Sequence, residues 1–208
     1  MSRPSLRHET AWKRKGHAHV AGIDEAGRGP LAGPVCVAAV ILPEKFTHKK
    51  LTDSKQLSEE VREKIYDELV VLSGLRWSAV MIHSEEIDQI NILQATHRAM
   101  RQVVEMLEPK PHVALIDGLP VPAFPIPHEA IVDGDCLSFS IAAASIIAKV
   151  TRDRFMKEAS ERYPVYGFHK HKGYGTREHL DALAKHGPCP LHRRSFSPVA
   201  QLTLPLGD

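Results

Sequence analysis

Acidic residues follow several apolar segments of this sequence, at the points where those segments end. Asp24 and Glu25 end a segment that starts at Val20. Asp117 ends another, and Asp135 lies between a short apolar segment and a helical pattern. Because strand ends of an α/β sheet gather at one edge, these carboxylates can converge from distant positions. Clustered carboxylates repel one another and a divalent cation relieves that repulsion, and hard oxygen ligands favour Mg²⁺ or Mn²⁺.

Each acid also has a simpler interpretation as a turn or cap residue. Asp24 precedes a glycine-containing turn, Asp117 is followed by glycine, and Asp135 lies near a possible helix N-cap. Consecutive strand residues point to opposite faces, so Asp24 and Glu25 cannot both enter one pocket from a regular strand. We therefore expect either a twist at the strand end or a contribution of Glu25 from the rim or through its carbonyl.

Glycine-rich and basic residues close to the first acids suit contacts to a polyanion. Gly27 and Gly29 flank Arg28. The glycines let the backbone approach a ligand closely, and Arg28 can reach a phosphate. Lys55 precedes a predicted helix and is a second candidate for phosphate contact. A simple turn and a solvated lysine are the alternative interpretations.

The C-terminal third carries a second set of candidates for nucleic-acid binding. Tyr174 lies between two glycines in a segment rich in His and Lys, so we expect an exposed ring able to stack, rather than a core tyrosine. Arg193 and Arg194 form a late basic pair that we expect to bind nucleic acid. Residues 1–20 and 166–195 are net basic and 21–165 net acidic, an arrangement that suits a nuclease but equally a protein with solvated tails.

The elements that must position these residues alternate between strands and helices. Strands are expected at 20–24, 35–42, 75–82, 113–116 and 130–132, and helices at 58–72, 85–107, 138–162 and 176–186. The short connection between the first two strands favours an antiparallel hairpin. This order predicts an α/β or α+β domain with helices against a mixed sheet.

The length of 208 residues, with 43% hydrophobic residues and a net charge of +2, predicts one globular domain. We expect residues 1–18 to form a flexible basic leader, 19–198 a single domain and 199–208 a short tail. The longest apolar stretch has 12 residues, from Leu31 to Leu42, against the roughly 20 that span a bilayer. A cytoplasmic monomer without membrane contact is therefore expected. Three widely spaced cysteines predict neither a disulfide framework nor a zinc site.

Several longer motifs follow one another along the chain. They are GIDEAGRGPLAGPV at 22–35, DSK at 53–55, DG at 117–118, GD at 134–135, SIAAASIIAKVTRD at 140–153 and HKGYGT at 171–176. Together they resemble the ribonuclease HII family from residue 20 to about 198. The resemblance implies a ribonuclease H-like fold with a helical C-terminal part.

The resemblance also implies an activity and a set of functional residues. Such enzymes cut RNA in RNA–DNA hybrids and cut 5′ to single ribonucleotides in duplex DNA, leaving a 3′-hydroxyl and a 5′-phosphate. It implies two Mg²⁺ or Mn²⁺ ions in the active complex. The implied metal ligands are Asp24, Glu25, Asp117 and Asp135. The implied junction-reading residues are Gly27, Arg28, Gly29 and the stacking Tyr174.

One position departs from the family pattern, because Asp133 stands where the family usually has lysine. Two alternative functions remain at this point. A ribonuclease HIII-like enzyme of longer hybrids usually has a lysine at the position of Arg28 and an additional N-terminal domain. A non-catalytic binder of hybrid or duplex nucleic acid would gain nothing from four carboxylates facing phosphate.

Overall fold

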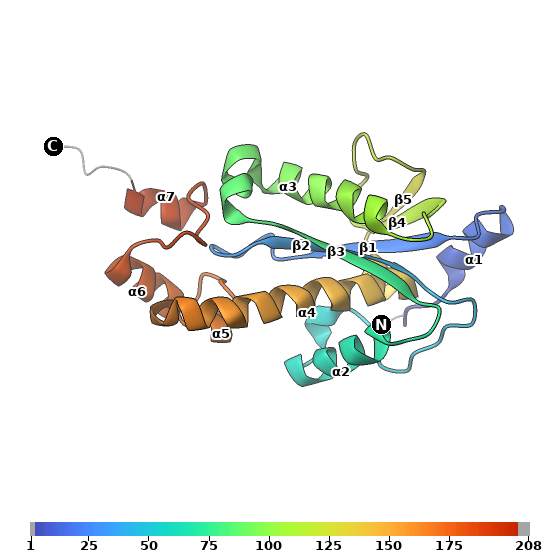
Figure 1. Cartoon of the computed structure of the whole chain (residues 1–208), viewed down its shortest axis with the longest axis horizontal. Coiled ribbons are helices and arrows are strands. Elements are labelled where there is room, and N and C mark those ends of the chain that lie inside the picture. The colour runs from blue at the N-terminus through green and yellow to red at the C-terminus, as the bar shows by residue number, and fades with distance from the viewer. Residues whose placement is uncertain (1–2, 204–208) are drawn as a thin grey trace.

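A five-stranded mixed sheet forms the centre of the computed structural model, which describes residues 3–203 (Figure 1). Its strand order is β3-β2-β1-β4-β5. The strands are β1 (Val20–Ala26), β2 (Val35–Ile41), β3 (Arg76–Ile82), β4 (Val113–Asp117) and β5 (His128–Ile131). β2 is antiparallel to both β1 and β3, whereas β4 is parallel to both β1 and β5. The predicted hairpin and the mixed sheet are confirmed.

Helices cover both faces of this sheet. The α-helices are α1 (Arg7–Arg14), α2 (Glu59–Val70), α3 (Ser84–Met106), α4 (Phe139–Arg162), α5 (Phe168–His171), α6 (Arg177–His186) and α7 (Ser197–Thr203). Short 3-10 helices are η1 (Ser54–Gln56), η2 (Gly134–Cys136) and η3 (Pro164–Tyr166). In Figure 1, α3 lies on one face of the sheet, α4 and α2 lie on the other, and α5 to α7 gather at one end. The helical C-terminal part is therefore confirmed.

The central strand β2 shows why the sheet needs helices on both faces. Val35 and Val37 belong to the cluster packed with α3, whereas Cys36 and Ala38 belong to the cluster packed with α4. Successive strand residues point to opposite faces, so a strand covered on both sides is apolar at every position. All seven residues of β2 are buried.

The long helix α4 packs unusually close to β1. Its N-cap residue Ser138 accepts a hydrogen bond from the backbone N–H of Ile141, which fixes where the helix begins. A Cβ added at Gly22 would lie 2.2 Å from the carbonyl carbon of Ser140, so only glycine permits this crossing. The crossing brings the buried face of α4 against the strand that ends in the first acids.

The prediction of a flexible leader over residues 1–18 is wrong for its central part, which forms helix α1. Glu9 is buried, and its Oε1 accepts hydrogen bonds from the Ser138 hydroxyl (2.7 Å) and the Ser140 backbone N–H (2.9 Å). Trp12 of the same helix donates from Nε1 to Glu129 Oε2 at 2.6 Å, so α1 is tied to both α4 and β5. Residues 1–2 lie outside the described residues.

The predicted tail of residues 199–208 also begins inside an ordered element, since α7 includes the fully buried Val199. Residues 204–208 lie outside the described part of the chain. Within residues 3–203, no helix is long and apolar enough to cross a membrane. The three cysteines are free, in agreement with the predicted absence of a disulfide framework.

Candidate active site

Three of the predicted acids meet at one edge of the sheet. Asp24 lies near the end of β1, and Asp117 ends the parallel neighbour β4. The register pairs the residues just before them, so the two acids lie side by side. Asp135 reaches the same place from η2, which follows β5. One carboxylate oxygen of each acid lies within 4.8 Å of the others, and we call these three residues the acid cluster.

The acid cluster concentrates negative charge in a poorly solvated place. Burial raises the pKa of Asp24 well above its usual value, and the charges of Glu25 and Asp117 raise it further. Burial and the neighbouring Asp117 raise the pKa of Asp135 to about 6, and burial also raises that of Asp117. Carboxylates in this situation are stabilised by a bound divalent cation, and the donors are all hard oxygens. The acid cluster therefore fits a divalent metal site.

Hydrogen bonds from the surrounding backbone and side chains hold the acid cluster in place. The Glu25 N–H donates to Asp24 Oδ1, and the Gly134 N–H donates to Asp117 Oδ1, each at 2.7 Å. The hydroxyl of Ser145, on the buried face of α4, hydrogen-bonds to Asp24. The hydroxyl of Ser54 lies 2.9 Å from that of Ser145. Sequence reasoning missed both serines as site residues, although a hydroxyl within the alanine-rich run of α4 was a usable signal.

Glu25 is not among the three residues of the acid cluster, which agrees with the alternation of side chains along a strand. Its Oε1 lies 3.3 Å from Arg28 Nη1, and burial raises its pKa against the opposing charge of Arg28. Glu25, Arg28 and Asp117 line a groove of about 340 Å³ together with residues of α3 and of the segment after β4. Glu25 therefore occupies the rim, and its part in metal binding stays a prediction.

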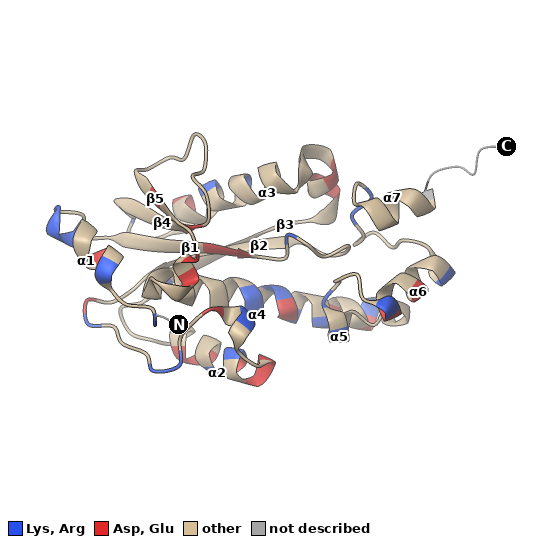
Figure 2. Ribbon diagram, turned by 180° about the vertical axis from the view of Figure 1, so that it is seen from behind, with Lys and Arg blue, Asp and Glu red and all other residues tan. Residues whose placement is uncertain are grey.

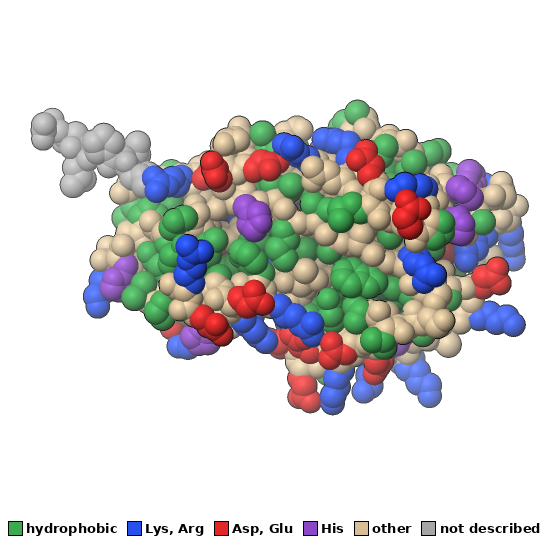
Figure 3. All heavy atoms as spheres, in the orientation of Figure 1, with side chains coloured by type: hydrophobic (Ala, Val, Ile, Leu, Met, Phe, Trp, Pro, Cys, Tyr) green, Lys and Arg blue, Asp and Glu red, His purple; other side chains and the backbone are tan. Residues whose placement is uncertain are grey.

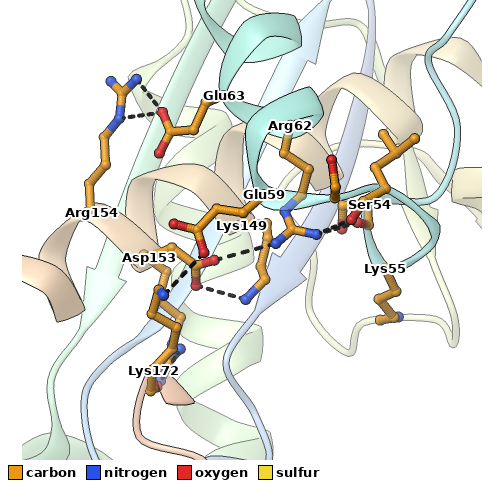
Figure 4. Close-up of polar contacts among 12 residues, drawn as sticks. Ser54, Lys55, Glu59, Arg62, Glu63, Lys149, Asp153, Arg154 and Lys172 are labelled. Atoms are coloured by element: carbon orange, nitrogen blue, oxygen red, sulfur yellow. Dashed lines mark hydrogen bonds and ion pairs between the residues drawn. The ribbon is translucent and has the colours of Figure 1, made fainter. Parts of the chain in front are cut away.

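Lys55 is held next to the acid cluster by η1. Burial lowers its pKa, but the charges of Asp24 and three further aspartates outweigh this effect and leave the pKa raised. Figure 4 shows how Arg62 supports this turn. Its Nη1 donates to the carbonyls of Ser54 (3.0 Å) and Leu57 (2.5 Å), while Nη2 lies 3.9 Å from Asp153. An exposed cation is thereby placed beside the acids.

The second predicted set, the loop at Gly27–Gly29 and Tyr174, is also brought together. A Cβ added at Gly29 would lie 3.9 Å from Cε1 of Tyr174, so the ring faces the exposed backbone of this loop. Tyr174 is 44% exposed, as predicted. Gly27 has φ +94°, and a Cβ there would lie 2.0 Å from Nε of Arg152. The sharp turn and the close arginine explain why this position needs glycine.

Comparisons with known proteins agree with this geometry. A family model described as Ribonuclease HII matches residues 21–199. A ribonuclease HII from Desulfitobacterium hafniense (strain DSM 10664 / DCB-2) is 54% identical over 196 residues, covering 94% of this chain and 75% of the relative. One from Bacillus cereus is 51% identical, covering 94% and 76%. The chain belongs to the ribonuclease HII family.

A solved structure supports the same assignment. The ribonuclease H2 of Pyrococcus horikoshii OT3 matches with a TM-score of 0.75 and 25% identity, covering 88% of this chain and 96% of that one. The ribonuclease HIII called Bst-RNase HIII, solved with Mn²⁺, has a TM-score of 0.68 at 18% identity, covering 88% of this chain and 68% of that one. The second likeness shows the fold alone. The chain is therefore an endonuclease of the ribonuclease H class, which excludes a purely binding role.

The prediction that Arg193 contacts nucleic acid is wrong, because this side chain is fully buried in the enzyme. Its guanidinium donates to the carbonyls of Gly27 (2.6 Å), Arg28 (2.8 Å) and Gly33 (3.0 Å). Those carbonyls would otherwise lack a donor in the interior, where an unpaired acceptor is costly. Arg193 thus shapes the Gly27–Gly29 loop.

Arg194 is exposed, and its backbone N–H donates to Asp88 Oδ2 at 2.8 Å. Its side chain remains a predicted phosphate contact. Asp133, which departs from the family pattern, is exposed with a left-handed backbone (φ 54°), and its charge raises the pKa of Asp117. The departure therefore adds negative charge at the edge of the acid cluster.

Acidic and basic residues lie close together in several parts of the enzyme. Figure 2 shows acidic residues at the end of β1 beside basic segments of α4. The opposite face, in Figure 3, carries acidic and basic side chains interspersed with apolar ones. The basic residues of α4 are engaged within the protein, since Arg152 is buried and Lys149 pairs with Asp153.

Proposed function

We propose that this enzyme hydrolyses the RNA strand of RNA–DNA hybrids and cuts on the 5′ side of single ribonucleotides embedded in duplex DNA, leaving a 3′-hydroxyl and a 5′-phosphate. The observation that carries the proposal is the position of Tyr174 against the Gly27–Gly29 loop, near a buried acid cluster. Tyr174 and the Gly27–Gly29 loop would recognise the ribonucleotide, and the acid cluster would serve the hydrolysis. The expectation of a cytoplasmic monomer stays a prediction.

Asp24, Asp117 and Asp135 would hold the metal, and we propose two Mg²⁺ or Mn²⁺ ions with Glu25 contributing from the rim. Divalent ions at such a site activate the attacking water and stabilise charge on the phosphate and the leaving 3′-oxygen. The chain itself would place the phosphodiester. Lys55 lies beside the acids and would contact a phosphate, with Arg28 and Arg194 as further contacts.

Specificity for RNA needs a contact to the 2′-hydroxyl, because phosphate contacts are the same for RNA and DNA. The exposed backbone of Gly29 and the Arg28 segment supports this role, since it can hydrogen-bond that hydroxyl directly. Arg193 fixes the loop from beneath. The Tyr174 ring would lie against the neighbouring deoxyribose, and a ribose at that position would pack less favourably against the ring. Together these contacts would recognise the RNA–DNA junction.

The proposed activity is tested with two duplexes that differ only in one ribonucleotide. Each duplex is incubated with the enzyme and Mg²⁺ or Mn²⁺. We expect one cut on the 5′ side of the ribonucleotide and no cut in the all-DNA duplex. A mobility shift without product in either metal would contradict the proposal. Cleavage restricted to long hybrids would favour the ribonuclease HIII-like alternative instead.

Tyr174→Ala tests the junction-reading role. We expect cleavage at a single embedded ribonucleotide to fall about tenfold more than cleavage within a long RNA run, because only the single site depends on a junction. Tyr174→Phe retains the ring and serves as the matched control. Equal losses on the two substrates would contradict this role.

A further inference from the structure

Three buried histidines lie directly beneath Tyr174. His179 is fully buried on α6, His192 is 2% exposed between Cys189 and Arg193, and His171 is 9% exposed at the end of α5. Within residues 3–203, none of their hydrogen-bond partners belongs to the acid cluster. Their ring nitrogens instead contact one another and nearby backbone, which fixes where each proton lies.

The hydrogen bonds of His192 and His179 run in one direction. The Cys189 backbone N–H donates to His192 Nδ1 at 3.0 Å, so this nitrogen carries no proton. The proton of neutral His192 therefore lies on Nε2, which is 3.0 Å from His179 Nε2. His179 Nε2 accepts, so its proton lies on Nδ1, which is 2.9 Å from the Tyr174 carbonyl oxygen. We call His192 and His179 the histidine relay.

His171 holds the same backbone from the other side. The Gly173 N–H donates to His171 Nδ1 at 3.2 Å, and His171 Nε2 donates to the Tyr166 carbonyl at 2.8 Å. The rings of His171 and His179 stack with centroids 4.5 Å apart and an angle of 14°. The peptide groups on either side of Tyr174 are therefore hydrogen-bonded to two imidazoles of fixed tautomer, those of His171 and His179.

The relay also connects the two parts of the enzyme that face the substrate. His192 precedes Arg193, whose guanidinium holds the carbonyls of Gly27 and Arg28. The same short segment thus supports Tyr174 through His179 and the glycine-arginine-glycine loop through Arg193. A displacement of this segment would change the separation between the Tyr174 ring and Gly29.

We propose that His179 and His192 are positioning residues for junction recognition, which set the Tyr174 ring against the Gly27–Gly29 loop through a directed relay of neutral imidazoles. The inference rests on the proposed role of Tyr174. The Tyr174 carbonyl also accepts a hydrogen bond from the Thr176 N–H at 2.8 Å, which the relay does not supply. Loss of the relay therefore shifts the tyrosine without unfolding its turn.

The relay is tested with two variants of one residue. His179→Phe keeps a ring of similar shape and removes both relay hydrogen bonds. His179→Asn keeps a side-chain N–H close to the position of Nδ1 and can still donate to the Tyr174 carbonyl. The measured quantity is the ratio of kcat/KM on a single embedded ribonucleotide to that on a long hybrid.

We expect His179→Phe to lower this ratio about tenfold and His179→Asn to restore most of it. His186→Phe, at an exposed position of α6, is the matched control and should leave the ratio unchanged. Thermal midpoints are measured alongside. An unchanged ratio in His179→Phe, with or without equal losses on both substrates, would overturn the proposal.

A second measurement is independent of activity. Long-range ¹H–¹⁵N NMR of the imidazoles at pH 7 should show His179 protonated on Nδ1, with His192 and His171 protonated on Nε2. Any other tautomer of His179 or His192 would overturn the relay even if Tyr174 reads the junction. Conversely, these tautomers together with equal losses in Tyr174→Ala would support the relay geometry and reject the proposed role of Tyr174.

Discussion

The acid cluster and the histidine relay are both groups of buried titratable side chains, but they differ in charge and in hydrogen bonding. In the acid cluster, like charges lie within 4.8 Å of one another and burial raises their pKa values, so the site favours a cation. In the histidine relay, each neutral ring donates one hydrogen bond to the next acceptor, from His192 to His179 and from His179 to the Tyr174 carbonyl. Burial lowers the pKa values of both histidines. Stored repulsion suits chemistry on a phosphate, whereas satisfied hydrogen bonds suit precise positioning.

The largest effect is expected from the acid cluster. Asp24→Asn should reduce cleavage of every substrate by about a thousandfold, which corresponds to roughly 4 kcal/mol of transition-state stabilisation. The same substitution relieves repulsion among buried carboxylates, so the thermal midpoint without metal should stay the same or rise. Asp133→Asn, at an exposed neighbouring position, is the control and should change the rate little. A marked fall in the metal-free midpoint of Asp24→Asn would show that the cluster is not strained by its charges.

Removing the support of the Gly27–Gly29 loop should lower stability, in contrast to Asp24→Asn. Arg193→Met removes the donors to three backbone carbonyls, so the free energy of unfolding should fall by about 3 kcal/mol, and junction cleavage should fall with it. Arg194→Met, one residue later and exposed, provides the matched control for stability. Denaturant unfolding of both variants measures the difference. Equal stabilities would contradict the structural role assigned to Arg193.

The pH dependence of stability gives a smaller effect. Burial, followed by the neighbouring His179, lowers the pKa of His192 from 6.5 to about 4. As the pH falls below 6.5, the unfolded chain takes up a proton that the folded protein excludes, so stability is lost between pH 6.5 and 4. At pH 5 this residue should cost ~2 kcal/mol relative to pH 7. His192→Gln should show a loss smaller by that amount, and identical pH slopes would contradict the neutral relay.

The sequence alone predicts the parts of the structure that depend on local patterns. Apolar strands ending in Asp24 and Asp117 predict their convergence, because strand ends in such sheets share an edge. Alternation along a strand predicts that Glu25 does not join Asp24 in the acid cluster. The exposure of Tyr174 follows from its flanking glycines. In each case the decisive information lies within a few neighbouring residues.

The parts that failed depend on contacts between distant residues. Arg193 looked like a surface base beside Arg194, but its burial depends on carbonyls more than 150 positions away. Helix α1 is held by hydrogen bonds of Glu9 to the start of α4 and of Trp12 to Glu129, both more than 100 positions away. The relay between His179 and His192 joins residues that show no motif spacing. Such contacts follow from the folded packing and not from a local pattern.

The most direct test of the central claim combines metal binding and cleavage in one variant. Wild type and Asp117→Asn are titrated with Mn²⁺ by calorimetry and assayed on a duplex with one ribonucleotide. The acid cluster predicts that Asp117→Asn loses saturable Mn²⁺ binding and cleavage together while keeping its fold. A variant that still cuts 5′ to the ribonucleotide at the wild-type rate would contradict the assignment of the acid cluster as the catalytic centre.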